Sequence, residues 1–283
     1  MNIIRLNKIE EKYNLKNNVY AVLGLDNITG SIKDITVYQM LLHFKSDGLL
    51  KEGTTIVEAT SGNTGIALSY YQKEFNYQCI IVMPSSMSEE RRKMITKFDA
   101  KLVLIDGGME ECHKYADELI KKNDNMILFD QFNNKYNVEA HYEITGPLIY
   151  NNIKDIDYIF AGIGTGGTIC GTTKYLKEKN NHVKAIGIEP YESPLLTKGY
   201  SNNHLIQGIG ANFIPEICKN RILDGIICIK GDEKFAIDET GKYIPITTEE
   251  CPELFPIYLE ESKQCIKDCR DYTFCQFCKL CSY

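Results

Sequence analysis

The feature that most constrains the fold of this chain is an alternation of two kinds of segment between about residues 17 and 230. Short runs rich in β-branched residues predict strands at 54–59, 79–84, 101–106, 126–130, 156–163 and 183–190. Longer amphipathic stretches predict helices at 35–45, 66–75, 88–99, 108–123 and 171–180. Ser88 stands where the third of these helices would be capped. The alternation predicts an α/β fold of mostly parallel sheets flanked by helices.

The composition is that of an ordinary globular protein, and it argues against two kinds of partner. The 283 residues carry 32 basic and 38 acidic side chains, a formal net charge of -6, whereas nucleic-acid surfaces are basic. No apolar run approaches the roughly 18–20 residues of a membrane span. The N-terminus lacks the apolar core of a signal peptide. We therefore expect a cytoplasmic protein with no nucleic-acid and no membrane partner.

Cysteine is distributed unevenly along the chain. Five of the 11 cysteines lie in residues 1–250 and six in residues 251–283. Four thiolates with C-x2-C spacing suffice to bind Zn²⁺ or an iron–sulfur cluster. The candidates are Cys269, Cys275, Cys278 and Cys281. Their spacing matches no standard zinc ribbon, so a metal site and a redox-active thiol tail stay open, and we favour a divergent tail without a metal.

Three short segments carry residues suited to chemistry. GTGGT at 164–168 follows an expected strand, and its amides and hydroxyls suit a phosphate, although paired glycines also suit a tight turn. TSGNTG at 60–65 has the same setting and suits a carboxylate, although such residues also cap helices. Lys33 follows a glycine turn. An ordinary lysine is a solvated charge, but burial lowers the pKa of a lysine and makes it competent for Schiff-base chemistry.

Taken together and in order, these segments resemble the cysteine synthase (O-acetylserine sulfhydrylase) branch of the fold type II pyridoxal-phosphate enzymes. Further matching segments are MSEERR at 87–92, QFNNKYN and HYEITGP within 131–147, GIEP at 187–190 and HLIQGIGANFIP at 204–215. The resemblance covers roughly residues 3–237. Seven motifs in family order are much more specific than any one of them alone.

The resemblance implies a cofactor and a set of site residues. Pyridoxal 5′-phosphate would be held by Lys33, which would also transfer protons, and Asn63 would bond the oxygen on the cofactor ring. The phosphate would be bound by Gly164, Thr165, Gly166, Gly167 and Thr168. The substrate carboxylate would be bound by Thr60, Ser61, Thr64 and Gln131. Gly208 would lie near the substrate's amino group.

The resemblance also implies a reaction, in which O-acetyl-L-serine loses acetate to give an α-aminoacrylate and sulfide then adds to form L-cysteine. Two alternatives stay open. One is another β-elimination or β-replacement, such as cysteine desulfhydrase activity or the formation of lanthionine or cystathionine. The other is a catalytically weak homologue that binds a partner's tail. The cofactor-side motifs do not separate these activities.

The implied architecture has two lobes, each a mostly parallel sheet flanked by helices. The smaller lobe would span 38–135, and the larger, cofactor-binding lobe would combine 1–37 with 136–240. Residues 241–283 would form a divergent Cys-rich tail. The family further implies a small amino-acid substrate, a homodimer and, as a possible partner, the C-terminal tail of serine acetyltransferase.

The chain also departs from the family pattern. Gly24 stands where the family has an acidic residue, Ile28 where it has proline and Ile35 where it has arginine. No S-S-G-like segment follows residue 240, so the hydroxyl partner of the cofactor's ring nitrogen is unassigned, and the C-terminal part of the larger lobe is predicted to be divergent or incomplete. Among the histidines, we expect His141 in the core or at a lobe interface and His113 on a solvated helix face.

Overall fold

The structure is a computed structural model that describes residues 1–60, 62–204, 206–218, 222–230, 234–237 and 243–246. Contacts divide the chain into two units. One contains residues 1–23 and the described residues after 231, and the other contains residues 24–231.

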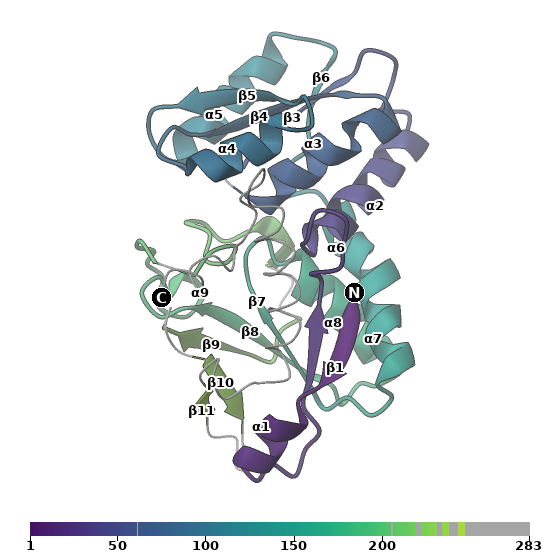
Figure 1. Ribbon diagram of the computed structural model, residues 1–283, viewed down its shortest axis with the longest axis vertical. Coiled ribbons are helices and arrows are strands. Elements are labelled where there is room, and N and C mark those ends of the chain that lie inside the picture. The colour runs from purple at the N-terminus through teal and green to yellow at the C-terminus, as the bar shows by residue number, and fades with distance from the viewer. Residues whose placement is uncertain (61, 205, 219–221, 231–233, 238–242, 247–283) are drawn as a thin grey trace, which may run out of the picture. The chain divides into compact units, whose positions relative to one another are not determined.

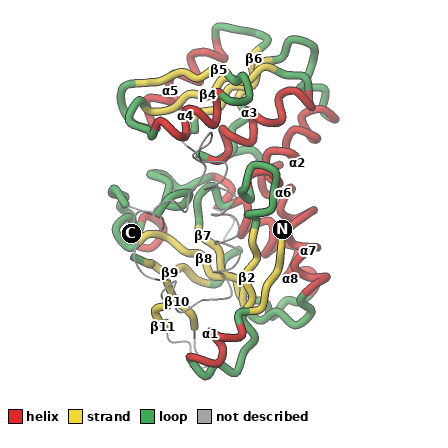
Figure 2. The backbone as a smooth tube through the Cα atoms, viewed as in Figure 1, coloured by secondary structure: helices red, strands yellow, loops and turns green. Residues whose placement is uncertain are grey.

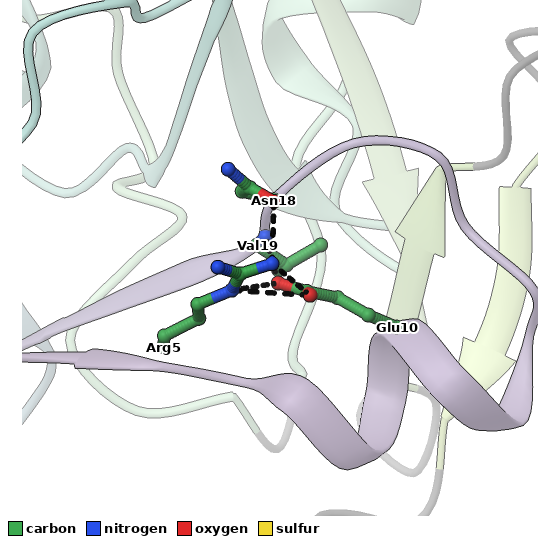
Figure 3. Close-up of polar contacts among 4 residues, drawn as sticks. All are labelled: Arg5, Glu10, Asn18 and Val19. Atoms are coloured by element: carbon green, nitrogen blue, oxygen red, sulfur yellow. Dashed lines mark hydrogen bonds and ion pairs between the residues drawn. The ribbon is translucent and has the colours of Figure 1, made fainter.

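The first unit is held by an antiparallel strand pair and one partly exposed ion pair. Strands β1 (Asn2–Arg5) and β2 (Tyr20–Leu23) pair with each other antiparallel, and α1 (Asn7–Lys12) lies between them in the sequence. Arg5 donates to both carboxylate oxygens of Glu10, and the Val19 amide donates to the same carboxylate at 2.6 Å (Figure 3). The hydrogen bond from Arg5 is the main cause of the lowered pKa of Glu10. Strands β10 (Lys234–Ile237) and β11 (Tyr243–Ile246) form a separate antiparallel pair.

The first sheet of the second unit is fully parallel. Its strand order is β5-β4-β3-β6, with bounds β3 Thr55–Ala59, β4 Gln78–Pro84, β5 Lys101–Ile105 and β6 Met126–Leu128. The helices between and before these strands are α2 Lys33–Ser46, α3 Asn63–Phe75, α4 Glu89–Thr96 and α5 Met109–Lys121. Val57 of β3 packs in one cluster with Cys112 of α5. On the opposite face, Ile81 of β4 packs against α3 at Gly65, where a Cβ would come within 3.2 Å of Ile81 and 2.9 Å of Thr60. Figure 2 shows helix following strand through this region.

The second sheet is also parallel and has the order β7-β8-β9. The strands are β7 Tyr158–Gly162, β8 Lys184–Pro190 and β9 Gly225–Ile229. The helices are α6 Tyr136–Ala140, a π-helical turn η1 His141–Thr145, α7 Gly146–Asn152, α8 Gly167–Lys179, α9 Leu195–Lys198 and a 3-10 turn η2 Glu216–Cys218. Helix α8 packs against α6, η1 and α7 (Figure 1). This packing needs glycine at Gly171, because a Cβ there would overlap the carbonyl oxygen of Val138.

The predicted α/β class with parallel sheets flanked by helices is confirmed. Several boundaries differ from the prediction. Helices α3 and α8 begin three and four residues earlier than expected, at Asn63 and Gly167, so the motif residues form their first turns. Helix α4 ends early, at Thr96, and Asp99 beyond it has a left-handed φ of 65°. Ser88 occupies the cap position of α4, but the expected side-chain cap bond is not formed.

The helical segment from Tyr136 to Asn152, with its π-helical turn, was not predicted. Among the described residues, no helix combines the length and apolarity needed to cross a membrane. The predicted Cys-rich tail at 241–283 lies outside the described residues except for 243–246.

Candidate active site

The site is built around Lys33, the first residue of α2. The turn before it is held by hydrogen bonds that need no proline. The backbone N–H and the hydroxyl of Thr29 both donate to the Asp34 carboxylate at 2.9 Å. Asn27 donates to the Ser31 carbonyl at 2.9 Å, and the Lys33 amide donates to the Ser31 hydroxyl at 3.2 Å. These bonds fix the backbone from which the Lys33 side chain projects.

The three departures from the family pattern lie around this turn. Gly24 lies so close to the backbone of Ile32 that a Cβ would come within 3.1 Å of its nitrogen. Ile28 is 64% exposed. Ile28 and Ile35 help to line a surface pocket of about 330 Å³, and Lys33 is not among the residues that line it. The substituted side chains at 28 and 35 therefore line a surface pocket beside the start of α2.

Lys33 is half-buried between two ionisable groups. Burial lowers the pKa of Lys33 to about 8, and the carboxylate of Glu58 opposes that effect. Glu58 is itself only 2% exposed, and burial raises its pKa to about 8. A lysine with this pKa exists partly as the neutral amine near pH 7–8, which is the form that attacks an aldehyde.

A second group, the fully buried ring of His141, also lies close enough to Lys33 to respond to its charge. The Nε2 atom is 2.9 Å from the Thr36 hydroxyl and 3.2 Å from the Thr168 hydroxyl, while Nδ1 is 2.9 Å from the Thr145 hydroxyl. Burial and then the charge of Lys33 lower the pKa of His141 to about 3, so the ring is neutral. His141 is therefore a core residue, as expected, and it joins α2 to the GTGGT segment.

The TSGNTG segment connects β3 to α3. Thr60 is buried, and its hydroxyl accepts a hydrogen bond from the Gly62 amide at 3.3 Å. Asn63 is the first residue of α3. The hydroxyl of Thr64 donates to Gln131 Oε1 at 2.7 Å. The structure thus brings together Thr64 and Gln131, two of the predicted carboxylate ligands, whereas Ser61 lies outside the described residues.

Gln131 is in turn tied to the GTGGT segment through one buried amide. Asn137 Nδ2 donates to the Gln131 carbonyl at 2.6 Å and to the Thr165 hydroxyl at 3.0 Å. On the other side, the Asp130 amide donates to Glu58 Oε2 at 3.0 Å. The Asp130 backbone has a left-handed φ of 55°. Two buried side chains, Asn137 and Glu58, therefore position the segment that carries Gln131.

The GTGGT segment runs from the end of β7 into the first turn of α8. Its glycines are required by their neighbours. A Cβ would overlap the Gly208 carbonyl oxygen at Gly164, the Cys218 sulfur at Gly166, and the Asn137 side chain at Gly167. The first amides of the 13-residue helix α8 lack intrahelical acceptors and lie at its positive end. The loop is thus a narrow backbone cradle for an anion such as a phosphate.

Gly208 lies against Gly164, with a positive φ of 86°. The residue before it, Gln207, accepts a hydrogen bond from Arg91 of α4. The structure therefore brings the predicted phosphate loop together with the segment predicted to lie near the substrate's amino group. It also joins this segment to α4, a connection that the sequence did not predict.

Sequence reasoning missed two residues with positioning roles, Glu58 and Asn137. Glu58 lies in an expected strand and Asn137 in the QFNNKYN segment, but nothing in their local pattern distinguishes them from other polar residues. The expectation for His113 was wrong. It is half-buried, its ring packs edge-on against Phe132 and Phe213 at centroid distances of 5.9 and 6.2 Å, and burial lowers its pKa. The Phe132 ring reaches it from the residue next to Gln131, which explains why the His113 ring is shielded from solvent.

The structure offers no metal site within its described part, where no group of three or more His, Cys, Asp or Glu side chains is suitably placed. The tail candidates Cys269, Cys275, Cys278 and Cys281 lie outside the described residues. The described site is therefore a combination of a lysine of lowered pKa, an anion cradle and a hydroxyl- and amide-lined segment.

Comparison with known proteins decides the family. Residues 2–236 match the model of the family described as "Pyridoxal-phosphate dependent enzyme". The chain belongs to this family. Over 219 residues it is 42% identical to cysteine synthase B of Campylobacter jejuni, which covers 76% of this chain and 73% of the relative.

Solved structures of pyridoxal-phosphate enzymes agree. The cysteine synthase of Entamoeba histolytica matches with a TM-score of 0.77 and 36% identity, over 81% of this chain and 69% of that one. A hydrogen sulfide-producing enzyme of Fusobacterium nucleatum matches with a TM-score of 0.76 and 37% identity, over 82% and 78% of the two chains. The protein is therefore a pyridoxal-phosphate-dependent enzyme of the cysteine synthase type, a group that carries out β-replacement or β-elimination on amino acids.

The residues of the site fit the cofactor that the family implies. The anion cradle at Gly164–Thr168 matches a phosphate in charge, because it lies at the positive end of α8. The Lys33 amine has the lowered pKa that condensation with an aldehyde requires. His141 links the two through its contacts with Thr168 and its proximity to Lys33.

Proposed function

We propose that this enzyme makes L-cysteine from O-acetyl-L-serine and sulfide by β-replacement. The observation that carries the proposal is the hydrogen-bonded connection from Thr64 through Gln131 and Asn137 to Thr165. It ties the segment suited to a substrate carboxylate to the segment suited to the cofactor phosphate. The identity of 42% with a cysteine synthase supports the choice of reaction.

Each group of residues has a task in this proposal. Thr60, Ser61, Thr64 and Gln131 bind and orient the carboxylate of the amino acid. Asn63 bonds the oxygen of the cofactor ring, Gly164–Thr168 hold its phosphate, and Gly208 approaches the substrate's amino group. When bound, pyridoxal phosphate supplies the electron sink that lets the α-proton and then the β-substituent leave. Lys33 takes and returns the α-proton, a role that suits a pKa of about 8.

A second activity, β-elimination that releases sulfide from cysteine, is favoured by one observation. The similar Fusobacterium structure is described as a hydrogen sulfide-producing enzyme. The two reactions share the loss of a β-substituent and differ in the molecule that enters or leaves. The predicted homodimer, the cytoplasmic location, the lobe boundaries and binding of the serine acetyltransferase tail remain proposals from the family resemblance.

The test compares wild type with Lys33→Ala and with Lys45→Ala, an exposed lysine on the same helix. Each protein is given pyridoxal phosphate, O-acetyl-L-serine and sulfide, and cysteine is quantified by chromatography. We expect cysteine from wild type and Lys45→Ala, and loss by at least about a thousandfold in Lys33→Ala, together with loss of the visible absorption band of the lysine-bound cofactor.

A parallel incubation with L-cysteine alone, followed by sulfide detection, distinguishes the second activity. Faster sulfide release than cysteine synthesis at equal substrate concentration would replace the first proposal with the second. Absence of both products from a wild-type protein that shows the lysine-bound cofactor band would refute both and favour the weak homologue.

A further inference from the structure

Two of the five described cysteines of this enzyme lie together beside the phosphate loop. Cys170, in the second turn of α8, is 4% exposed, and Cys218, the last residue of η2, is half-buried. Their thiols hydrogen-bond to each other, and both belong to one apolar cluster with Ile163 and Ile169. This arrangement places two thiols from positions 48 residues apart in the sequence in direct contact.

The remaining described cysteines have different surroundings. Cys79 and Cys112 are buried, and burial raises the pKa of each. Cys228 is half-buried, with its sulfur 3.4 Å from the Thr197 hydroxyl and 3.6 Å from a carboxylate oxygen of Glu189. Cys170 and Cys218 differ from these three in their surroundings, because each has the other's thiol as a hydrogen-bond partner.

The thiol pair contacts the backbone of the phosphate loop directly. The Cys218 thiol donates to the Thr165 carbonyl at 3.6 Å, and its sulfur occupies the space in which a Cβ on Gly166 would lie. The Cys170 amide donates to the Gly166 carbonyl at 3.0 Å. A change in the bonding of these two sulfurs must therefore alter the backbone contacts of Thr165 and Gly166, whichever β-reaction the enzyme performs.

We propose that Cys170 and Cys218 form a disulfide when the enzyme meets a peroxide, and that this bond weakens binding of the cofactor phosphate at Gly164–Thr168. The hydrogen bond between the two thiols lowers the pKa of Cys170 and, together with burial, raises that of Cys218, so Cys170 is the thiolate that reacts first. It attacks one peroxide oxygen, which breaks the O–O bond and gives a sulfenic acid on Cys170, and the hydroxide that leaves takes up a proton to become water. The Cys218 sulfur then attacks the Cys170 sulfur and displaces its hydroxyl, which takes the Cys218 thiol proton and leaves as a second water. Two thiols and one hydrogen peroxide thus give one disulfide and two waters.

Two features favour these steps. The two thiols are in contact, so Cys218 lies beside the sulfenic acid as it forms. The apolar cluster packed around the pair limits the approach of a second peroxide, which would oxidise the sulfenic acid further. A reducing thiol reverses the reaction by thiol–disulfide exchange.

The expected weakening follows from the geometry. A disulfide brings the sulfurs to about 2.05 Å, much closer than two hydrogen-bonded thiols. Cys218 must then move toward α8, and its S–H no longer donates to the Thr165 carbonyl. Loss of one such hydrogen bond, with the accompanying shift at Gly166, corresponds to a rise of about fivefold or more in the dissociation constant of pyridoxal phosphate.

The experiment uses the full-length enzyme with its cofactor. It is treated with a small excess of hydrogen peroxide, free thiols are blocked with N-ethylmaleimide, and a non-reduced digest is examined by mass spectrometry. We expect a cross-linked pair of peptides containing Cys170 and Cys218, lighter than the two reduced peptides by two hydrogens. The variants Cys218→Ser, Cys218→Ala and Cys170→Ser lack this product, and the matched control Cys228→Ser retains it.

Cofactor affinity is then measured by fluorescence titration with pyridoxal phosphate before oxidation, after it and after reduction. We expect the dissociation constant to rise on oxidation in wild type and Cys228→Ser, to recover on reduction, and to stay unchanged in the Cys170 and Cys218 variants. The proposal is overturned if the oxidised cysteines pair with other partners, such as the tail cysteines. It is equally overturned if the Cys170–Cys218 disulfide forms while the affinity stays the same.

Discussion

Substitution of Glu58 by glutamine tests the electrostatics around Lys33 most directly. Glu58 is 2% exposed, and one carboxylate oxygen accepts the Asp130 amide at 3.0 Å. Burial raises the pKa of Glu58 from 4.5 to about 8, although hydrogen bonds from Asp130 and Gln131 favour its ionised form. Glutamine has the same shape and can accept the same hydrogen bond, so Glu58→Gln removes the ionisation and keeps the packing.

The size and sign of the effect follow from proton linkage. Between pH 4.5 and about 8 the unfolded chain releases the proton of residue 58 and the folded protein retains it. The folded state therefore loses stability as the pH rises through this range, by about 1.4 kcal/mol for each pH unit. The full range gives an upper value of about 5 kcal/mol. Glu58→Gln escapes this loss, so its free energy of unfolding should exceed that of wild type by several kcal/mol at pH 9 and match it at pH 4.5.

The measurement is urea unfolding of the cofactor-free protein at several pH values, followed by circular dichroism. Glu118→Gln, which changes an exposed carboxylate on α5, is the control and should shift stability by less than about 0.5 kcal/mol at every pH. A difference between Glu58→Gln and wild type that is the same at pH 5 and pH 9 would show that Glu58 is not held in its protonated form, and the reasoning would fail.

Two other predictions concern the packing around the site. The pKa of about 3 for His141 means that between pH 6.5 and 3 the unfolded chain binds a proton at this residue and the folded protein does not. The free energy of unfolding of wild type should therefore fall as the pH falls through this range, and that of His141→Gln should fall less, as urea unfolding can show. Gly171→Ala places a Cβ on the Val138 carbonyl and should lower the free energy of unfolding by about 3 kcal/mol or more. Gly225→Ala, where a Cβ meets only the end of the Ile186 side chain at 3.3 Å, should cost less than about 1 kcal/mol, and thermal unfolding compares the two.

The fold class could be predicted from the sequence because its main signal is local. Runs such as 54–59 and 79–84 are apolar and β-branched, and the strands they form are buried on both faces, as parallel strands are. The sequence predicts the starts of α3 and α8 later than the observed starts at Asn63 and Gly167, because glycine, threonine and asparagine have low intrinsic helix propensity. In this fold those residues enter the first turn, where packing permits no larger side chain at Gly65 or Gly167.

The site could be predicted only where a motif carries the chemistry on one stretch of chain. Lys33 and the GTGGT segment have such motifs. In the structure His141 contacts the Thr168 hydroxyl and lies near Lys33, so it connects the two. Glu58 and Asn137 owe their importance to partners that lie far away in the sequence, at positions 130 and 165. No local pattern encodes a contact of that kind, so a single sequence could not single them out.

The family positions that this chain changes and those that it keeps differ in what they contact. Ile28 and Ile35 face a surface pocket that does not include Lys33, so the proline and arginine of the family pattern can be lost there without removing a bond to the lysine. Thr29 and Asp34, by contrast, form the buried bonds that hold the turn before Lys33. Replacing either partner would leave a buried polar group unpaired, at a cost of about 1–3 kcal/mol. The turn can therefore hold Lys33 in place even though its surface no longer follows the family pattern.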